Sequence, residues 1–345
     1  PDDAANGFLG FFEAEEKLTT CGNCHVGTQA KWEDTEHAVA WEGLQDSGHA
    51  QSFCEGCHTV TELGNAATES SGYHEVPEER YQQAQCESCH GPGPDHVQNP
   101  DANQPLATLQ VGLELTNGCG ECHQGNHHGF VNDWLESNHA APWGEFFPGG
   151  VDAGGAAALR PECQSCHLGQ GALASWGVEG SYVEAGAPAS SEDRLAITCG
   201  VCHDPHGSNN EAMLRFPIDV ADAEQHLCAQ CHNRTTTPNP ESSHGLEPHA
   251  PETALLEGDV GWFPPGLEVD RGDIIATHGS EANPGLCATC HVNRYDVTDQ
   301  ETGEFVFSST GHNFEPVPCV DEQGVPGGED CELSREARSF KGCTA

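Results

Sequence analysis

The sequence predicts a fold of short α-helices and long loops with very little β-structure. Three observations support this expectation. The 345 residues include 41 Gly and 22 Pro, only 36% are apolar, and a five-residue pattern, Cys-x-x-Cys-His, occurs eight times. Gly and Pro interrupt regular elements. A chain this poor in apolar residues can bury little surface in a core made of protein alone.

The repeated pattern is the attachment signal for c-type haem. Two thiols add to two vinyl groups of one porphyrin, and the adjacent His becomes the proximal ligand of the iron. A zinc site would instead pair two Cys-x-x-Cys units, which would leave eight following histidines unexplained. We therefore predict eight haem c groups, which form much of the core. The motifs, numbered 1 to 8 below, begin at Cys21, Cys54, Cys86, Cys119, Cys163, Cys199, Cys228 and Cys287.

The motifs define the first two sets of predicted site residues. The thioether-forming cysteines are Cys21, Cys24, Cys54, Cys57, Cys86, Cys89, Cys119, Cys122, Cys163, Cys166, Cys199, Cys202, Cys228, Cys231, Cys287 and Cys290. The proximal ligands are His25, His58, His90, His123, His167, His203, His232 and His291.

Thirteen further histidines are candidates for the opposite face of each iron. A second His is typical of electron-transfer haems, whereas an open face permits substrate binding. The predicted distal ligands are His37, His49, His96, His139, His206, His249, His278 and His312. The weaker candidates are His74, His127, His128, His226 and His244, and any single His could instead lie on the surface or bond a haem propionate. No catalytic residue is predicted.

An internal repeat orders the first two thirds of the chain. Motif 1 precedes Trp32-x-x-Thr35-x-His37-Ala38, and motif 4 precedes Trp134-x-x-Ser137-x-His139-Ala140. Two more motifs follow each stretch, and the third motif of each set precedes His96 or His206. We expect each internal His on a short helix. The predicted segments are 1–20, a three-haem module at 21–110, a second at 119–210, a two-haem module at 211–318 and a tail at 319–345.

Three cysteines lie in the tail outside any motif. Cys319 and Cys331 could form a disulfide in an oxidising compartment, which leaves Cys343 unmatched. The other interpretation of Cys343 is that the sequence is cut from a longer protein, inside a further haem site.

The formal net charge of −43 limits the kinds of partner that the protein can bind. Such a surface repels nucleic acid and anionic lipid and favours basic partners or cations. Acidic clusters such as Glu13-Ala14-Glu15-Glu16 are candidates for calcium, although a solvated run of charge is the plainer interpretation.

Covalent haem attachment takes place outside the cytoplasm, so we expect an exported protein. The chain contains no signal peptide and no apolar run of 18 residues. A mature form without a membrane span is the expectation, secreted or at the cell surface rather than periplasmic.

Residues 20–210 resemble known multihaem cytochromes. Trp32…His37-Ala38, motif 2 and Cys86-Glu87-Ser88-Cys89-His90-Gly91-Pro92-Gly93-x-x-His96 resemble the cytochromes typified by the tetrahaem electron acceptor of hydroxylamine oxidoreductase. Cys199 to Gly207 is similar to the periplasmic decahaem conduits. The resemblance implies close haem pairs with distal ligation by His37, His96, His139 and His206. Acidic, loop-rich extracellular cytochromes that form filaments are a looser likeness.

Two functions follow from these patterns. The favoured one is an electron conduit without chemistry of its own, extracellular and able to polymerise, with other redox proteins or copies of itself as partners. Inter-subunit His ligation would account for part of the His surplus. The alternatives are a periplasmic carrier and a reductase or oxidase of a small nitrogen or sulfur substrate with one open haem.

Overall fold

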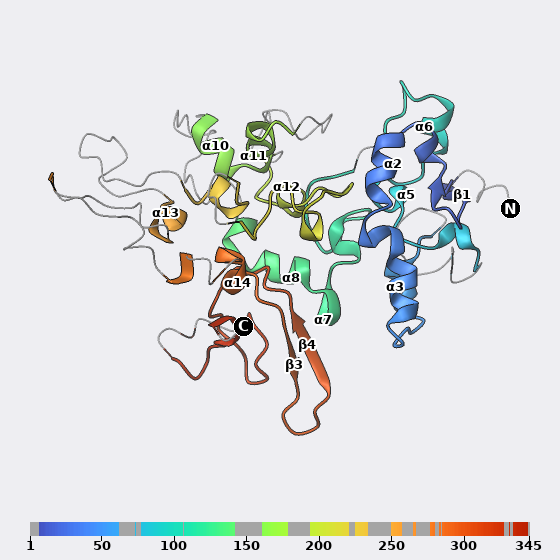
Figure 1. The fold of residues 1–345 in the computed structure, drawn as a ribbon. Coiled ribbons are helices and arrows are strands. Elements are labelled where there is room, and N and C mark those ends of the chain that lie inside the picture. The colour runs from blue at the N-terminus through green and yellow to red at the C-terminus, as the bar shows by residue number, and fades with distance from the viewer. Residues whose placement is uncertain are drawn as a thin grey trace. The chain divides into compact units, whose positions relative to one another are not determined.

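A computed structural model describes most of the chain, and short elements dominate it (Figure 1). The described residues are 7–61, 73, 77–105, 107–141, 161–178, 194–220, 225–233, 250–256, 265–266, 277–279, 283, 285–327, 331 and 334–343. Among them, no helix exceeds seven residues and the strands form two hairpins. The prediction of short helices, many loops and little β-structure is confirmed.

The chain divides into two compact units. The first combines Pro1–Asn132 with Gly180–Met213, and the second combines Asp133–Glu179 with Leu214–Ala345. Motifs 1 to 4 and motif 6 belong to the first unit, and motifs 5, 7 and 8 belong to the second. The modules drawn from the sequence repeat are a different division of the chain, and they stay a prediction.

The first unit consists of brief helical turns around one small hairpin. Its elements are β1 (Phe11–Glu13), β2 (Leu18–Thr19), η1 (Cys21–Asn23), α2 (Val26–Trp32), η2 (Glu36–Val39), α3 (Ala40–Asp46), α4 (Glu55–His58), η3 (Glu79–Tyr81), α5 (Cys86–His90), α6 (Pro94–Gln98), η4 (Cys119–Glu121), α7 (Gly125–His128), α12 (Cys199–Cys202) and η8 (Glu211–Met213). The helix α8 (Phe130–Leu135) begins in this unit and ends in the second.

The described part of the second unit contains the longer hairpin and four α-helices. Its elements are η5 (Asn138–Ala140), α10 (Pro161–His167), α11 (Gly169–Ser175), η9 (Cys228–Gln230), α13 (Glu252–Leu256), η11 (Thr277–Gly279), α14 (Leu286–His291), β3 (Tyr295–Thr298), β4 (Phe305–Ser309) and η12 (Lys341–Cys343). Strands β3 and β4 run antiparallel, with Tyr295 opposite Ser309. Asp299 closes the hairpin turn by accepting hydrogen bonds from the backbone and hydroxyl of Thr302.

Local sequence signals explain why the helices stop so soon. Helix α5 begins with a capping box between Gln85 and Ser88. It ends at Gly91, whose φ of +70° is a left-handed conformation that cannot continue a helix. Pro94 then occupies the first turn of α6, where its missing N–H costs no hydrogen bond. These caps and breakers limit α5 and α6 to five residues each.

The apolar clusters of the described residues are small. In the first unit, one cluster joins Phe8, Val60 and Tyr81. A second cluster joins Phe11, Trp32 and Ala38. Each of these clusters joins only three buried side chains, which agrees with the expectation that cofactors supply much of the apolar surface.

The two copies of the internal repeat have the same local geometry. The Thr35 hydroxyl donates to the Trp32 carbonyl at 2.7 Å, and the Ser137 hydroxyl donates to the Trp134 carbonyl at 2.7 Å. In both copies a short 3₁₀ turn follows, and it carries the internal His. The expected short helix at this His is therefore present in each copy.

The tail contains the disulfide considered from the sequence. Cys319 and Cys331 are bonded, with an S–S length of 2.01 Å. Cys343 lies exposed at the end of η12 with a free thiol. None of the helices in the described part of the chain is long and apolar enough to cross a membrane.

Candidate haem centres

Each of the eight motifs includes a helical turn. The turns are η1, α4, α5, η4, α10, α12, η9 and α14. The backbone N–H of the motif His bonds the carbonyl of the first Cys at 3.0 Å in motif 1 and 2.9 Å in motif 4. Residues i, i+3 and i+4 of a helical turn share one face. Both thiols and the imidazole of a motif are therefore on the side that one porphyrin would occupy.

Backbone carbonyls orient several motif histidines. Nδ1 lies 2.6 Å from the Ala40 carbonyl in His58, 2.7 Å from the Ala212 carbonyl in His203 and 2.7 Å from the Phe314 carbonyl in His291. A carbonyl only accepts, so Nδ1 carries the proton and the lone pair lies on Nε2. Histidines that bind metals are commonly fixed in this way, with the second nitrogen donating to an outer partner.

Carboxylates lie near Nδ1 of two other histidines, at longer distances than these carbonyls. Nδ1 of the motif residue His232 lies 3.4 Å from a Glu252 oxygen. Nδ1 of His206, outside any motif, lies 3.5 Å from an Asp204 oxygen. An acidic partner on Nδ1 raises the basicity of the ligating nitrogen.

Five pairs of histidine rings face each other at a nearly constant distance. In every pair one ring comes from a motif and the other from outside the motifs, and the ring centres are 6.0 to 6.2 Å apart. The pairs are His25–His96, His123–His37, His58–His128, His90–His206 and His232–His139.

This distance fits one metal ion between two imidazoles. A metal–imidazole bond is about 2 Å and the ring centre lies about 1 Å beyond the nitrogen, so ligands on opposite faces of one ion have centres about 6 Å apart. The same separation recurs in all five pairs. The donor set therefore fits a six-coordinate haem iron with two His ligands.

Burial disfavours the charged form of three of the paired histidines. Desolvation lowers the pKa of His37 and of His90 below the usual value. For His139, burial is the main cause and nearby histidines contribute, and together they lower the pKa to about 4. A histidine must be neutral to offer a lone pair to a metal, so all three are in the ligating form at neutral pH.

The pairs include four of the predicted distal ligands: His37, His96, His139 and His206. Three others lie elsewhere in the described chain. His49 is exposed after α3, His278 is exposed in η11, and the Nδ1 of His312 contacts the Thr310 carbonyl at 3.1 Å. His249 falls outside the described residues. Distal ligation by all eight stays a prediction.

His128 is the paired histidine that the sequence analysis placed among the weaker candidates. It ends the short helix α7, and its ring lies 6.1 Å from that of the motif residue His58. The repeat could not reveal it, because no His occupies the matching stretch after motif 1. The doubled His127-His128 so soon after motif 4 was the available signal.

Motif cysteines from different parts of the chain lie side by side. In the first unit, hydrogen-bonding contacts link the sulfur of Cys21 to Cys86, Cys57 to Cys122 and Cys119 to Cys199. In the second unit, the same kind of contact links Cys228 to Cys287. These contacts place motif 1 next to motif 3, motif 2 next to motif 4, motif 4 next to motif 6, and motif 7 next to motif 8.

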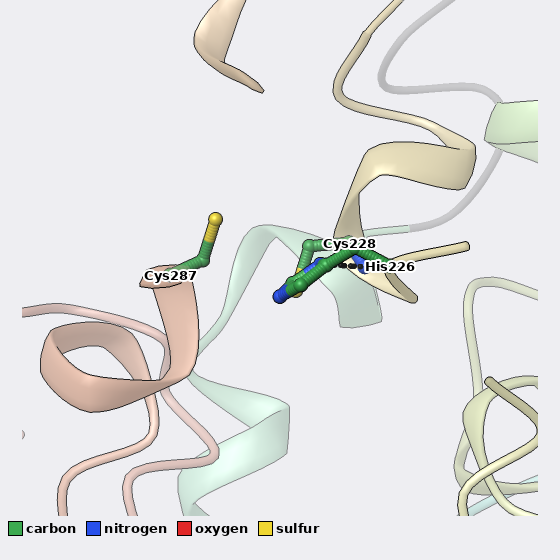
Figure 2. Close-up of side chains that lie close together, drawn as sticks. All are labelled: His226, Cys228 and Cys287. Carbon is green, nitrogen blue, oxygen red and sulfur yellow. Dashed lines mark hydrogen bonds between the residues drawn. The ribbon is translucent and has the colours of Figure 1, made fainter. Parts of the chain in front are cut away.

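The contact between motifs 7 and 8 includes a buried histidine. Ligand atoms of His226, Cys228 and Cys287 lie within 4.8 Å of one another (Figure 2). Nδ1 of His226 accepts from the Cys228 backbone at 3.1 Å, so Nε2 carries the proton and donates to the Ile218 carbonyl at 3.0 Å. Both nitrogens of His226 are engaged in these bonds, which attach His226 to the first Cys of motif 7, and its role as a distal ligand stays a prediction.

This is the one cluster of three or more metal-binding groups within the described residues. The acidic run at Glu13 is not part of any such cluster, and the calcium expectation gains no support.

Apolar side chains beside the ligands suit a porphyrin face. Val26 follows the motif residue His25, Val97 follows its ring partner His96, and Phe53 precedes motif 2. All three are more than half exposed to solvent in the protein alone. Large apolar groups in such positions are expected where an apolar cofactor packs.

Comparison with known families agrees with the motifs and their geometry. The family model for cytochrome c554 and c-prime matches residues 20–91, and the model for a doubled CXXCH motif matches residues 188–237. No curated protein and no solved structure matches the chain. Motifs, paired histidines and family matches together make the chain a multihaem c-type cytochrome that binds haem covalently and transfers electrons.

Proposed function

We propose that this cytochrome is an octahaem electron conduit outside the cytoplasm, and that its irons carry two His ligands. The five ring pairs are the observation that supports this proposal most strongly. Haem supplies reversible one-electron transfer when bound. The chain contributes an imidazole on each side, which keeps substrates off the iron and holds the ligand geometry constant when the charge changes.

The contacts between motifs support a closely spaced path. In the first unit they join motif 1 to 3, motif 2 to 4 and motif 4 to 6. In the second unit they join motif 7 to 8. Neighbouring haem edges within each unit allow electrons to pass without a mobile carrier between them.

Intact mass and low-temperature EPR of the oxidised protein test haem number and ligation together. We expect a mass increase of eight haems and only low-spin iron. A high-spin signal of about one haem that shifts with nitrite or hydroxylamine would overturn the conduit proposal in favour of a reductase or oxidase.

The EPR line shapes carry a second, sharper expectation. The rings of His90 and His206 are nearly parallel, at 9°, whereas those of His139 and His232 are nearly perpendicular, at 89°. Parallel imidazoles lift the degeneracy of the iron d orbitals and give rhombic signals, whereas perpendicular imidazoles give a strongly anisotropic signal. Both types should be present. Their absence would show that the ring pairs do not bind iron.

The extracellular and filamentous parts of the proposal rest on charge and resemblance. A net charge of −43 repels copies of the chain, so assembly requires salt or cations to screen it. We expect filaments in electron micrographs at high ionic strength and single particles at low ionic strength. Single particles under both conditions, with the protein found in the periplasmic fraction, would support a diffusing carrier instead.

A further inference from the structure

Asp133 is a buried carboxylate that the haem centres described above do not use. It is 5% exposed and lies in α8. One of its oxygens accepts hydrogen bonds from the Thr310 backbone at 2.9 Å and from the Thr310 hydroxyl at 2.7 Å. The backbone N–H groups of Gly311 and His312 also donate to this carboxylate. Four donors to one carboxylate hold residues 310–312 in place.

The turn that Asp133 holds has little freedom to relax. Gly311 has φ of +74°, and a Cβ there would come within 2.5 Å of the Val292 backbone. Phe314 has φ of +58°, which is unfavourable for a residue with a side chain. Surrounding contacts must therefore maintain this conformation. Burial raises the pKa of Asp133 and the four hydrogen bonds lower it, and these bonds attach the turn to α8.

The same turn touches the ligands of two haem centres. The Phe314 carbonyl lies 2.7 Å from Nδ1 of His291, the proximal ligand of motif 8. The Phe314 ring lies edge-on to His139, with centres 4.4 Å apart and planes at 84°. His139 is the ring partner of His232 in motif 7. One turn thus orients a ligand of motif 7 and a ligand of motif 8.

We propose that Asp133 is a positioning residue that sets the reduction potentials of the haems at motifs 7 and 8 together. It holds the turn that orients His139 and His291, and its buried negative charge favours the ferric form of both irons. The inference rests on the haem ligation proposed above. It adds that one turn, held by Asp133, contacts a ligand of each of the two centres.

EPR-monitored redox titration of the Asp133→Asn holoprotein tests the inference. We expect an unchanged haem mass, and higher potentials at two centres, one of which is the perpendicular His139–His232 centre. At a fixed electrode potential the ferrous-to-ferric ratio of these two should rise about three- to tenfold, where tenfold corresponds to about 59 mV for one electron. The anisotropic signal should also change shape, because the Phe314 ring is less firmly held.

Asp299→Asn is the matched control. Asp299 also accepts bonds from a backbone N–H and a hydroxyl of one threonine, but it lies at the tip of the β3–β4 hairpin. The same chemical change there should leave every potential unaltered. Thr310→Ser should behave like the natural protein, whereas Thr310→Val should shift the same two centres by less than Asp133→Asn.

Unchanged potentials in an intact Asp133→Asn holoprotein would overturn the inference, as would a uniform shift of all centres. If the Asp133→Asn variant yields no holoprotein, the Thr310→Val variant tests the inference instead. Unchanged potentials at the two centres in Thr310→Val would then overturn it. Failure of the proposed function is distinguishable, because it appears in the unsubstituted protein as missing low-spin signals.

Discussion

Residues 31–38 and 133–140 are two copies of one local structure in two different settings. Both contain a buried Trp, a hydroxyl bonded back to its carbonyl, and a His that faces a motif His. The residue before the Trp differs. Lys31 is 61% exposed and lies 3.9 Å from Asp204, whereas Asp133 is 5% exposed and holds the turn at Thr310.

The difference between Lys31 and Asp133 separates two roles within the repeat. The shared hydroxyl forms the same local bond to the Trp carbonyl in both copies, directly before the turn that carries the paired His. The shared residues position the paired His, and the residue before the Trp connects this local structure to its surroundings. A surface ion pair does this in the first unit and a buried carboxylate does it in the second.

Removal of either internal His should have the largest effect. In His37→Ala and His139→Ala we expect one haem of eight to become high-spin, since each variant opens one iron face. Optical and EPR spectroscopy measure the high-spin fraction. His37→Met and His139→Met are the controls, because Met can restore the sixth bond at a higher potential. A fully low-spin Ala variant would contradict the pairing.

Removal of either Trp should have the next largest effect. Trp32 is 6% exposed and donates to the Ala84 carbonyl at 3.0 Å, and Trp134 is equally buried. Trp→Ala at either position should lower the free energy of unfolding by about 3–5 kcal/mol, measured by guanidinium denaturation of the holoprotein. Trp→Phe should cost less. Markedly unequal losses would show that the two copies pack differently.

Loss of the repeat hydroxyl should cost less again. Thr35→Ala and Ser137→Ala each remove one bond to the preceding turn, with an expected cost of about 1 kcal/mol. The exchanges Thr35→Ser and Ser137→Thr keep the hydroxyl and should be nearly neutral in the same denaturation experiment. A large loss of stability in either exchange would show that the methyl group, rather than the hydroxyl, determines the stability of the repeat.

The smallest effect is expected at Lys31. An exposed ion pair is worth about 0–1 kcal/mol, so Lys31→Ala should hardly alter the denaturation midpoint or the spin state. Asp133→Ala, at the equivalent position, should lower the midpoint clearly. Similar changes of the midpoint in Lys31→Ala and Asp133→Ala would show that the two copies do not differ at this position.

The sequence predicted what depends on neighbours in the chain. Short patterns with their own chemistry could be predicted from the sequence. These are the motifs with their histidines, the internal repeat and four of the histidines in the ring pairs. Short helices and the 319–331 disulfide followed from composition and compartment in the same way.

The pairing of the histidines could not be predicted from the sequence. His37 faces His123 and His206 faces His90, and only the folded chain brings such distant positions together. Asp133 lies 177 positions before Thr310, and nothing around either residue in the sequence points to the other. Contacts between motifs were hidden for the same reason, since every motif carries the same five-residue pattern.

The carbonyls that orient the histidines have a consequence for how this protein can change. His58, His203 and His291 are aimed by the main chain at Ala40, Ala212 and Phe314. A substitution at Ala40, within α3, replaces a side chain and leaves the carbonyl in place, so the sequence can vary there while the orientation of His58 is kept. Ala212 and Phe314 have φ of +51° and +58°, which are unfavourable for residues with a side chain, so replacements at these two positions should disturb the carbonyls that orient His203 and His291.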